Sequence, residues 1–269
     1  MPSFIMSFAR AGSVAGLVIF TCQPARAFDP SPHLARYQVY LGAAPGSPAI
    51  GSGLQRLSHD CRQWTLEREV HVDFNLAGNL QMHIDSRLKG IESFRGDSFT
   101  YELTRMRNDI KQQISGTVTM LDKGGRAAVR YPSGPVGLDL PARTAMPVKA
   151  IGQALARLKK GGGNFSITTF DPETVGNAMT VDVAPAPRES VRQRLAATMA
   201  RSSDAAEGWP INMSFSSATR AGTPPYYTLN GMMLESGALD RLTIRSGFFT
   251  FAADLIELQP IDTPQCPRA

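Results

Sequence analysis

Residues 61–74 read CRQWTLEREVHVDF, the longest run in the chain with the clean two-residue alternation of a β-strand. One parity carries the apolar residues Trp64, Leu66, Val70, Val72 and Phe74. The other parity carries Gln63, Thr65, Glu67, Glu69, His71 and Asp73. Because successive side chains of a strand point to opposite faces of a sheet, one face should meet a core and the other should meet water. We therefore predict a half-buried strand around which a β-rich domain is organised.

Runs with the same alternation continue on both sides of this strand. We expect strands within residues 34–41, 42–53, 80–88, 99–103, 110–121, 126–131, 165–170, 179–183, 211–215, 226–234, 239–244 and 248–258. Turn residues separate several of them, as at Asp122–Gly125, Ser236–Gly237 and Ser246–Gly247. Short strands at this spacing indicate an antiparallel barrel or sandwich. No period of about 20 to 50 residues repeats, which disfavours a propeller or solenoid.

One segment changes its period. From Pro147 to Lys160 the apolar residues recur at spacings of three and four, which predicts an amphipathic helix. The apolar face is Val148, Ile151, Leu155 and Leu158, with Lys149, Gln153 and Arg157 opposite. Thr144 is the candidate N-cap and Gly161 the candidate left-handed stop. We expect the helix to plug one end of the sheet; the alternative is a membrane-surface helix, for which the apolar stripe is short.

A second segment, residues 185–208, departs from the strand pattern by its many arginines and alanines. Val191, Leu195 and Met199 recur at helical spacing within it. We predict a surface insertion that is partly helical.

The first 27 residues have the pattern of a secretory signal peptide. Arg10 ends a short basic region, residues 11–20 form an apolar run, and Ala25–Ala27 is a small-x-small cleavage site. A transmembrane anchor would need about 20 apolar residues. A lipoprotein anchor at Cys22 would need small residues before it, where this chain has bulky ones. We therefore predict export to the periplasm and a mature domain at residues 28–269.

Removal of residues 1–27 takes away Cys22 and leaves Cys61 and Cys266. Two cysteines in an exported chain favour a disulfide, the alternative being two free buried thiols. Because this bond would close nearly the whole mature chain, the chain-entropy model allows it up to about 5 kcal/mol of stabilisation. We predict a Cys61–Cys266 bridge.

The charge balance disfavours one class of partner. The net charge of +5 falls to +3 when Arg10 and Arg26 are removed with the signal peptide. The remaining basic residues are dispersed among 23 acidic ones, without the basic stripe and stacking aromatics that nucleic-acid binding requires. We expect no nucleic-acid partner and no membrane-spanning segment.

A search for catalytic motifs finds none in its required context. Ser86 and Lys89 match Ser-x-x-Lys, but they lie in an expected strand, whereas that chemistry needs both residues on one helical turn. Lys159–Gly163 ends a helix where a phosphate loop would begin one. There is no Gly-x-Ser-x-Gly elbow and no dinucleotide-binding glycine motif. We expect no enzymatic activity, and we assign no catalytic residue and no cofactor.

Metal binding is the other chemistry that the residues allow. Two neighbouring expected strands carry His59, Asp60, His71, Asp73 and His83. His71 and Asp73 share a face, which permits a site between two strands. Polar residues on the solvent face of a sheet explain the same pattern, and on this ground we assign no metal site. His33, next to the first strand, is in a position to tuck into the fold.

Several segments form a further pattern when they are taken together. They are residues 32–41 (PHLARYQVYL), Cys61 ahead of its strand, residues 138–141 (LDLP), Met146–Pro147 with the helix, Phe170–Asp171, residues 209–211 (WPI), and residues 236–258 before Cys266. In this order, over most of the mature chain, they resemble the EipB family of cell-envelope integrity proteins. The resemblance implies one open, spiral-like antiparallel β-barrel with a single helix, its ends stapled by the Cys61–Cys266 bridge.

The resemblance also implies a function. We expect a periplasmic, non-enzymatic structural or interaction protein that supports cell-envelope integrity, with another periplasmic protein or an envelope lipid as its partner. The alternative is a carrier or sensor that holds an acyl chain inside the curved sheet. The abundant Met and Phe residues are consistent with this function, but they are equally consistent with an ordinary hydrophobic core. A hydrolase is the third possibility, disfavoured because no nucleophile and base pair is recognised.

Overall fold

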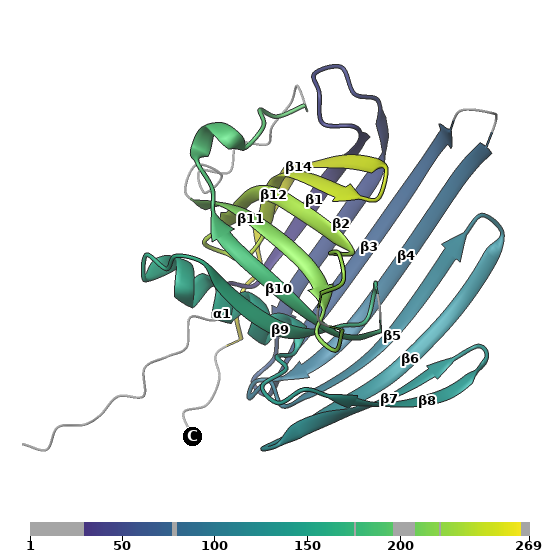
Figure 1. Ribbon diagram of the computed structural model, residues 1–269, viewed down its shortest axis with the longest axis vertical. Coiled ribbons are helices and arrows are strands. Elements are labelled where there is room, and N and C mark those ends of the chain that lie inside the picture. Colours follow the sequence, from purple (N-terminus) through teal and green to yellow (C-terminus); the bar gives the residue numbers. More distant parts are fainter. Residues whose placement is uncertain (1–29, 77–79, 175, 196–207, 221, 265–269) are drawn as a thin grey trace, which may run out of the picture.

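The computed structural model describes residues 30–76, 80–174, 176–195, 208–220 and 222–264 (Figure 1). The predicted signal peptide at residues 1–27 lies outside these ranges, as do Met199 and Cys266. Within the described residues, no helix is both long and apolar enough to span a membrane.

The described residues form fourteen strands, one α-helix and one short 3-10 helix. The first eight strands are β1 (His33–Leu41), β2 (Ala49–His59), β3 (Gln63–Leu76), β4 (Leu80–Ser93), β5 (Ser98–Arg107), β6 (Ile110–Leu121), β7 (Gly124–Tyr131) and β8 (Gly134–Leu140). Then follow α1 (Pro147–Lys159), β9 (Phe165–Asp171), β10 (Asn177–Pro185), η1 (Arg188–Ser190), β11 (Gly208–Ser217), β12 (Tyr227–Leu234), β13 (Leu239–Ser246) and β14 (Phe249–Pro260). The prediction of a mainly β fold with one helix is confirmed.

The sheet consists of two meanders that meet in its middle. Its strand order is β8-β7-β6-β5-β4-β3-β2-β1-β14-β13-β12-β11-β10-β9, with antiparallel neighbours throughout. The first and last strands therefore pair with each other, from His33 opposite Pro260 to Leu41 opposite Phe251. The edge strands are β8 and β9, and α1 lies between them in the chain. The result is an open, curved sheet whose two edges are connected through the helix (Figure 1).

The alternation predicted for the central strand is present in β3. Trp64, Leu66, Val72 and Phe74 are buried, whereas Val70 is 38% exposed. Arg68 shares the parity of these apolar residues, so its side chain faces the interior of the curved sheet. The buried face of β3 thus has two apolar ends with a polar section between them.

Aromatic rings join the two halves of the sheet. The rings of Phe99 and Tyr101 on β5 and of Phe170 on β9 are buried, with centroids 5.6 to 6.4 Å apart. Two glycines make room for them. A Cβ on Gly90 would lie 2.4 Å from the Phe99 ring, and a Cβ on Gly116 would lie 2.5 Å from the Tyr101 ring. Aromatic contacts of this kind contribute about 0.5 to 1.5 kcal/mol beyond the burial of their area.

The helix α1 spans Pro147–Lys159, within one residue of the predicted range. Its apolar residues pack against the strands: Val148, Leu155 and Leu158 are buried, and Ile151 is partly buried. The residues predicted on the opposite face, Lys149, Gln153 and Arg157, are exposed. Gly161 has the left-handed conformation expected of a helix stop, with φ of 69°. The amphipathic pattern was therefore sufficient to place this helix and its buried face.

The predicted N-cap, Thr144, is wrong. The Thr144 hydroxyl donates to the Pro141 carbonyl at 2.7 Å, and the residue that precedes the helix is Met146, which makes no side-chain cap bond. The cap comes from Glu92 of β4, whose carboxylate accepts the backbone N–H groups of Val148 and Lys149 at 2.7 and 2.8 Å. A carboxylate here satisfies open donors and is favoured by the helix dipole. Burial nevertheless raises the pKa of Glu92 to about 7, against the effect of these hydrogen bonds.

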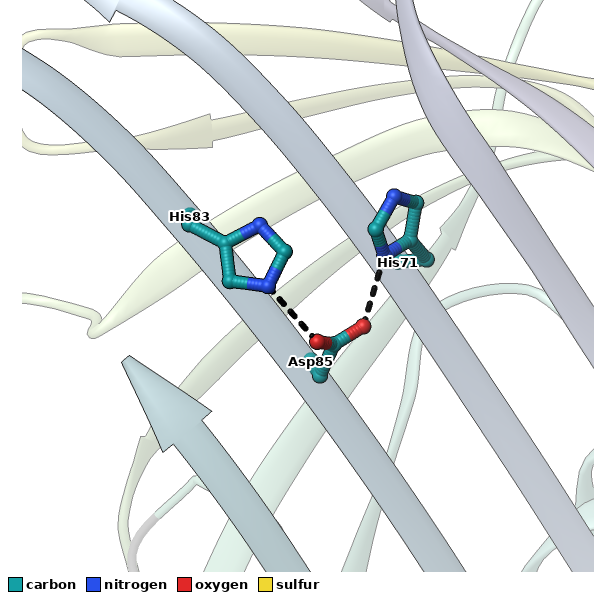
Figure 2. A group of neighbouring side chains, drawn as sticks. All are labelled: His71, His83 and Asp85. Atoms are coloured by element: carbon teal, nitrogen blue, oxygen red, sulfur yellow. Dashed lines mark hydrogen bonds and ion pairs between the residues drawn. The ribbon is translucent and has the colours of Figure 1, made fainter. Parts of the chain in front are cut away.

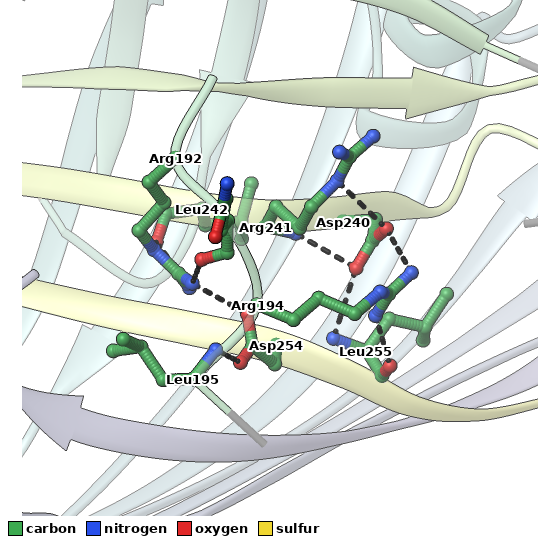
Figure 3. Close-up of polar contacts among 9 residues, drawn as sticks. Arg192, Arg194, Leu195, Asp240, Arg241, Leu242, Asp254 and Leu255 are labelled. Atoms are coloured by element: carbon green, nitrogen blue, oxygen red, sulfur yellow. Dashed lines mark hydrogen bonds and ion pairs between the residues drawn. The ribbon is translucent and has the colours of Figure 1, made fainter. Parts of the chain in front are cut away.

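The segment after β10 is not helical over Val191–Leu195. After η1 the chain runs extended across β13 and β14 (Figure 3). The Arg192 guanidinium pairs with Asp254 at 2.7 Å and donates to the Leu242 carbonyl, while Arg194 pairs with Asp240. Both carboxylates are fully buried. Two charged anchors thus hold this strap, residues 188–195, where the arginine-rich sequence suggested a partly helical insertion.

Two strands differ from the expectation. The weak strand expected before Gly53 is β2, which begins at Ala49 and continues to His59. The strand β8 was not predicted, because GPVGLDL contains glycines and a proline that are poor strand formers. It is tolerated at the edge of the sheet, where a strand needs backbone partners on one side.

Candidate functional site

The residues of the Ser-x-x-Lys motif lie on opposite faces of β4. Ser86 stands across from Val70 of β3, and Lys89 stands across from Glu67, with which it forms an ion pair at 3.9 Å. Side chains three positions apart on a strand point away from each other. The motif is therefore not assembled into one site.

Cys61 lies in the turn between β2 and β3, at the surface of the domain. Its predicted partner, Cys266, lies outside the described residues. The Cys61–Cys266 bridge stays a prediction.

His59 and Asp60 stabilise the same turn. The His59 ring lies 4.7 Å from the Trp64 ring and 5.4 Å from the Phe94 ring, edge to face in both contacts. The Asp60 carboxylate accepts the backbone N–H groups of Arg62 and Gln63, and these bonds lower the pKa of Asp60. Both residues thus have local structural roles, remote from the other histidines of the predicted strand pair.

The other two histidines of that pair meet at one carboxylate (Figure 2). The His71 Nδ1–H group donates to Asp85 Oδ1 at 2.6 Å, and His83 Nε2–H donates to Asp85 Oδ2 at 2.8 Å. The hydrogen bond from His71 is the larger cause of a lowered pKa for Asp85, and that from His83 adds to it. We call His71, His83 and Asp85 the His–Asp cluster. Sequence reasoning missed Asp85, because the register that sets it opposite His71 is not visible in the sequence.

A chain of hydrogen bonds inside the sheet connects its two halves. Buried His33 donates from Nδ1 to the Ser31 carbonyl at 2.7 Å and accepts the Gln55 amide at Nε2, 3.1 Å away. Burial lowers the pKa of His33, which favours this neutral form. Arg68 donates to Gln55 at 3.1 Å and to Glu173, in the turn between β9 and β10, at 2.8 Å. These contacts give His33 and the polar section of β3 a structural role inside the sheet.

A hollow with many polar side chains in its walls lies on the second meander. A cavity of about 590 Å³ opens along β9 to β13, and its lining includes the apolar residues Phe165, Val183, Ala184, Met213 and Leu229. The polar side chains that line it come from all five strands: Asn164 before β9, then Ser166, Asp182, Asn212, Ser214, Thr228, Asn230, Thr243 and Arg245. We call this surface the polar groove.

The strand register places the charges of the polar groove at its two sides. Asp182 of β10 stands opposite Ser214, Ser214 opposite Thr228, and Thr228 opposite Arg245 of β13. Three strand spacings of about 4.8 Å put roughly 14 Å between the acidic and the basic position. Asp182 accepts a hydrogen bond from Ser166, and the Asn230 amide donates to Asn212 at 2.9 Å. The groove therefore offers amides and hydroxyls between one negative and one positive charge.

The sequence carried a weak signal for this surface. On each of these strands the polar residues alternate with buried ones, as on any solvent-facing strand. Their alignment into one row depends on the register of four strand pairs, which alternation leaves open.

Comparison with known proteins gives one family and a structural relative. A family model described as EipB-like matches residues 24–262. No curated protein is a match to this chain. The crystal structure of a β-barrel-like protein of the domain of unknown function DUF1849, from Brucella abortus, is similar with a TM-score of 0.73. That similarity covers 87% of this chain and 99% of the other at 18% identity, so it concerns the fold alone.

Proposed function

This chain belongs to the EipB-like family, and on that premise we propose that it is an exported, non-enzymatic protein that supports the integrity of the cell envelope. It acts in the periplasm by binding another molecule, not by chemical transformation. The observation that carries this proposal is the polar groove, a hollow of about 590 Å³ that spans five strands.

The chemistry of the groove favours an extended polar partner. Its amide and hydroxyl groups match the donors and acceptors of a polypeptide backbone, and Asp182 and Arg245 can pair with opposite charges on that partner. Phe165, Met213 and Leu229 also line the groove and can contact apolar side chains of the same partner. We propose that the partner is a segment of another periplasmic protein.

The arrangement of the histidines supports a role without catalysis. His33 is hydrogen-bonded inside the sheet, and His59 packs between aromatic rings. His71 and His83 both contact Asp85. The serine and lysine of the formal catalytic motif face opposite sides of β4. Hydrolysis by a serine nucleophile uses a general base beside that nucleophile. None of the contacts described here pairs a nucleophile with such a base.

Site-specific crosslinking in intact cells tests the proposed partner class. A photoreactive residue in place of Asn212, in the groove, should crosslink to a periplasmic protein, whereas one in place of exposed Thr117 on β6 should not. Asp182→Lys should suppress the crosslink from position 212. Equal crosslinking from both positions, or none from position 212, would contradict binding through the groove.

One observation favours the lipid carrier as a second candidate. Near the ends of β3 and β4, Phe74 packs with Met82 and Ile84, which are partly buried, and its ring lies 6.5 Å from that of Phe249, which is 37% exposed. This partly open apolar cluster is a place where an acyl chain could bury area. Native mass spectrometry of protein purified from the periplasm tests this candidate. Co-purifying lipid would favour the carrier function, and a mass equal to that of the protein alone would exclude it.

A further inference from the structure

The His–Asp cluster lies where the sheet narrows to two strands. β2 pairs with β3 as far as Val72, and β5 pairs with β4 from Ile84 onward. Beyond these points, within the described residues, β3 and β4 pair with each other and with no other strand. A two-stranded ribbon is marginally stable in water. A link between its strands at this point would therefore change local stability more than one in the middle of the sheet.

The donor atoms of the cluster are close enough to share one ion. One ligand atom each from His71, His83 and Asp85 lie within 4.8 Å of one another. A tetrahedral ion with bonds of about 2.0 to 2.1 Å holds its ligands roughly 3.3 Å apart. Because the two hydrogen bonds are 2.6 and 2.8 Å long, small outward rotations of these side chains suffice to admit an ion.

The cluster is also accessible and has further negative charge beside it. Its side chains are 30 to 54% exposed, so a hydrated ion can reach them without opening the fold. Asp73 stands opposite His83 in the strand register, which gives a square of two histidines and two aspartates across β3 and β4. A carboxylate near a metal-binding imidazole orients it and strengthens it as a ligand.

We propose that the His–Asp cluster binds a divalent transition-metal ion, of which Zn²⁺ is the representative, and that the ion joins β3 to β4 where the ribbon leaves the sheet. Two imidazoles with one carboxylate suit zinc and its first-row neighbours, whereas calcium and magnesium prefer oxygen ligands throughout. Three protein ligands leave further positions for water. The ion has a structural role in this proposal, and the site is independent of the polar groove.

Isothermal titration of the mature chain, without an affinity tag, with Zn²⁺ tests the site. The wild type should bind one ion per chain, and His71→Gln, His83→Gln and Asp85→Asn should each weaken binding by at least about tenfold. His59→Gln is the matched control, because it removes a histidine outside the cluster, and it should leave the affinity unchanged. Absence of saturable binding, or equal affinity for the wild type and the His71→Gln/His83→Gln double variant, would overturn the proposal.

A second measurement tests the structural role of the ion. Adding Zn²⁺ should slow amide hydrogen exchange in residues 71–76 and 80–85 of the wild type and of His59→Gln, but not of the double variant, because binding to the folded state opposes local opening. Without metal, the wild type and the double variant should melt at nearly the same temperature, since both side chains are partly exposed and glutamine can also donate to Asp85. Binding with no change in exchange would overturn the claim that the ion joins the strands.

Discussion

At the scale of single residues, Glu92 shows how a polar side chain holds two elements together. It lies on β4, is 1% exposed, and accepts two backbone N–H groups from the first turn of α1. Sequence reasoning placed the cap at Thr144, a residue of the right type just before the helix. The residue that caps the helix is instead Glu92, which precedes Val148 by 56 residues in the chain. Nothing in the sequence next to the helix indicates this contact.

The raised pKa of Glu92 predicts a pH dependence of stability. Because its pKa is about 7 in the folded chain against an ordinary 4.5, the folded state keeps a proton that the unfolded state releases between these values. This contribution to stability is full below pH 4.5 and is lost as the pH rises through 7. Relative to Glu92→Gln, the wild type should therefore lose unfolding free energy over this range in urea titrations. A difference that does not vary with pH would contradict the raised pKa.

At the scale of elements, α1 depends on the burial of its apolar face. Leu155→Ala and Leu158→Ala should each lower the unfolding free energy by about 2 to 5 kcal/mol, because each removes a buried side chain and leaves a cavity. Gln153→Ala and Arg157→Ala, on the exposed face, should change it by less than about 0.5 kcal/mol. Chemical denaturation measures all four variants. Small, equal effects on both faces would mean that the helix does not pack as described.

The strap at residues 188–195 depends on two of its three arginines, Arg192 and Arg194. Arg192→Met should lower the unfolding free energy by about 3 kcal/mol, because it removes the guanidinium that lies 2.7 Å from the fully buried Asp254 carboxylate. Arg188→Met is the control, since that side chain is exposed and donates to the Gly208 carbonyl at 3.3 Å. Equal melting temperatures for the two variants would show that the Arg192–Asp254 pair adds nothing to stability.

Local patterns predicted most elements, and non-local contacts account for the errors. Two-residue alternation located the described strands except β2, which was expected over residues 42–53, and β8, and the three-to-four spacing located α1. The strap was predicted to be partly helical because Val191 and Leu195 have helical spacing. It runs extended because Arg192 and Arg194 bind carboxylates on strands that come much later in the chain. For the same reason, His71 and His83 could be named from the sequence but Asp85, their common partner, could not.

At the scale of the whole molecule, β1 pairs with β14, so the two ends of the described chain lie in the middle of the sheet. The resemblance to the EipB family anticipated an open sheet of this kind, which neither composition nor alternation distinguishes from a closed barrel or a sandwich. The polar groove also belongs to this scale. It exists because the register of four strands aligns Asp182, Ser214, Thr228 and Arg245 in one row.

The predicted Cys61–Cys266 bridge is a property of the whole chain as well. Thiol titration of protein isolated from the periplasm, under denaturing and non-reducing conditions, should find no free thiol. Cys61→Ser should lower the unfolding free energy by about 2 to 5 kcal/mol, as loss of a native disulfide does. Two free thiols per chain would contradict the bridge.

Complementation tests whether this protein supports the envelope by binding through the polar groove. Cells that lack the protein should grow in rich medium but be more sensitive to detergents and cell-wall antibiotics, and the full chain should restore resistance. A chain without residues 1–27 should fail because it remains in the cytoplasm, and Ser86→Ala should complement fully.

The decisive comparison is between two charge reversals. Asp182→Lys with Arg245→Glu, in the groove, should accumulate normally and fail to restore resistance. Arg126→Glu with Asp139→Lys, an ion pair of β7 and β8 whose side chains are 83 and 91% exposed, should complement as the wild type does. Full resistance from the folded groove variant would contradict a role of the polar groove in envelope integrity.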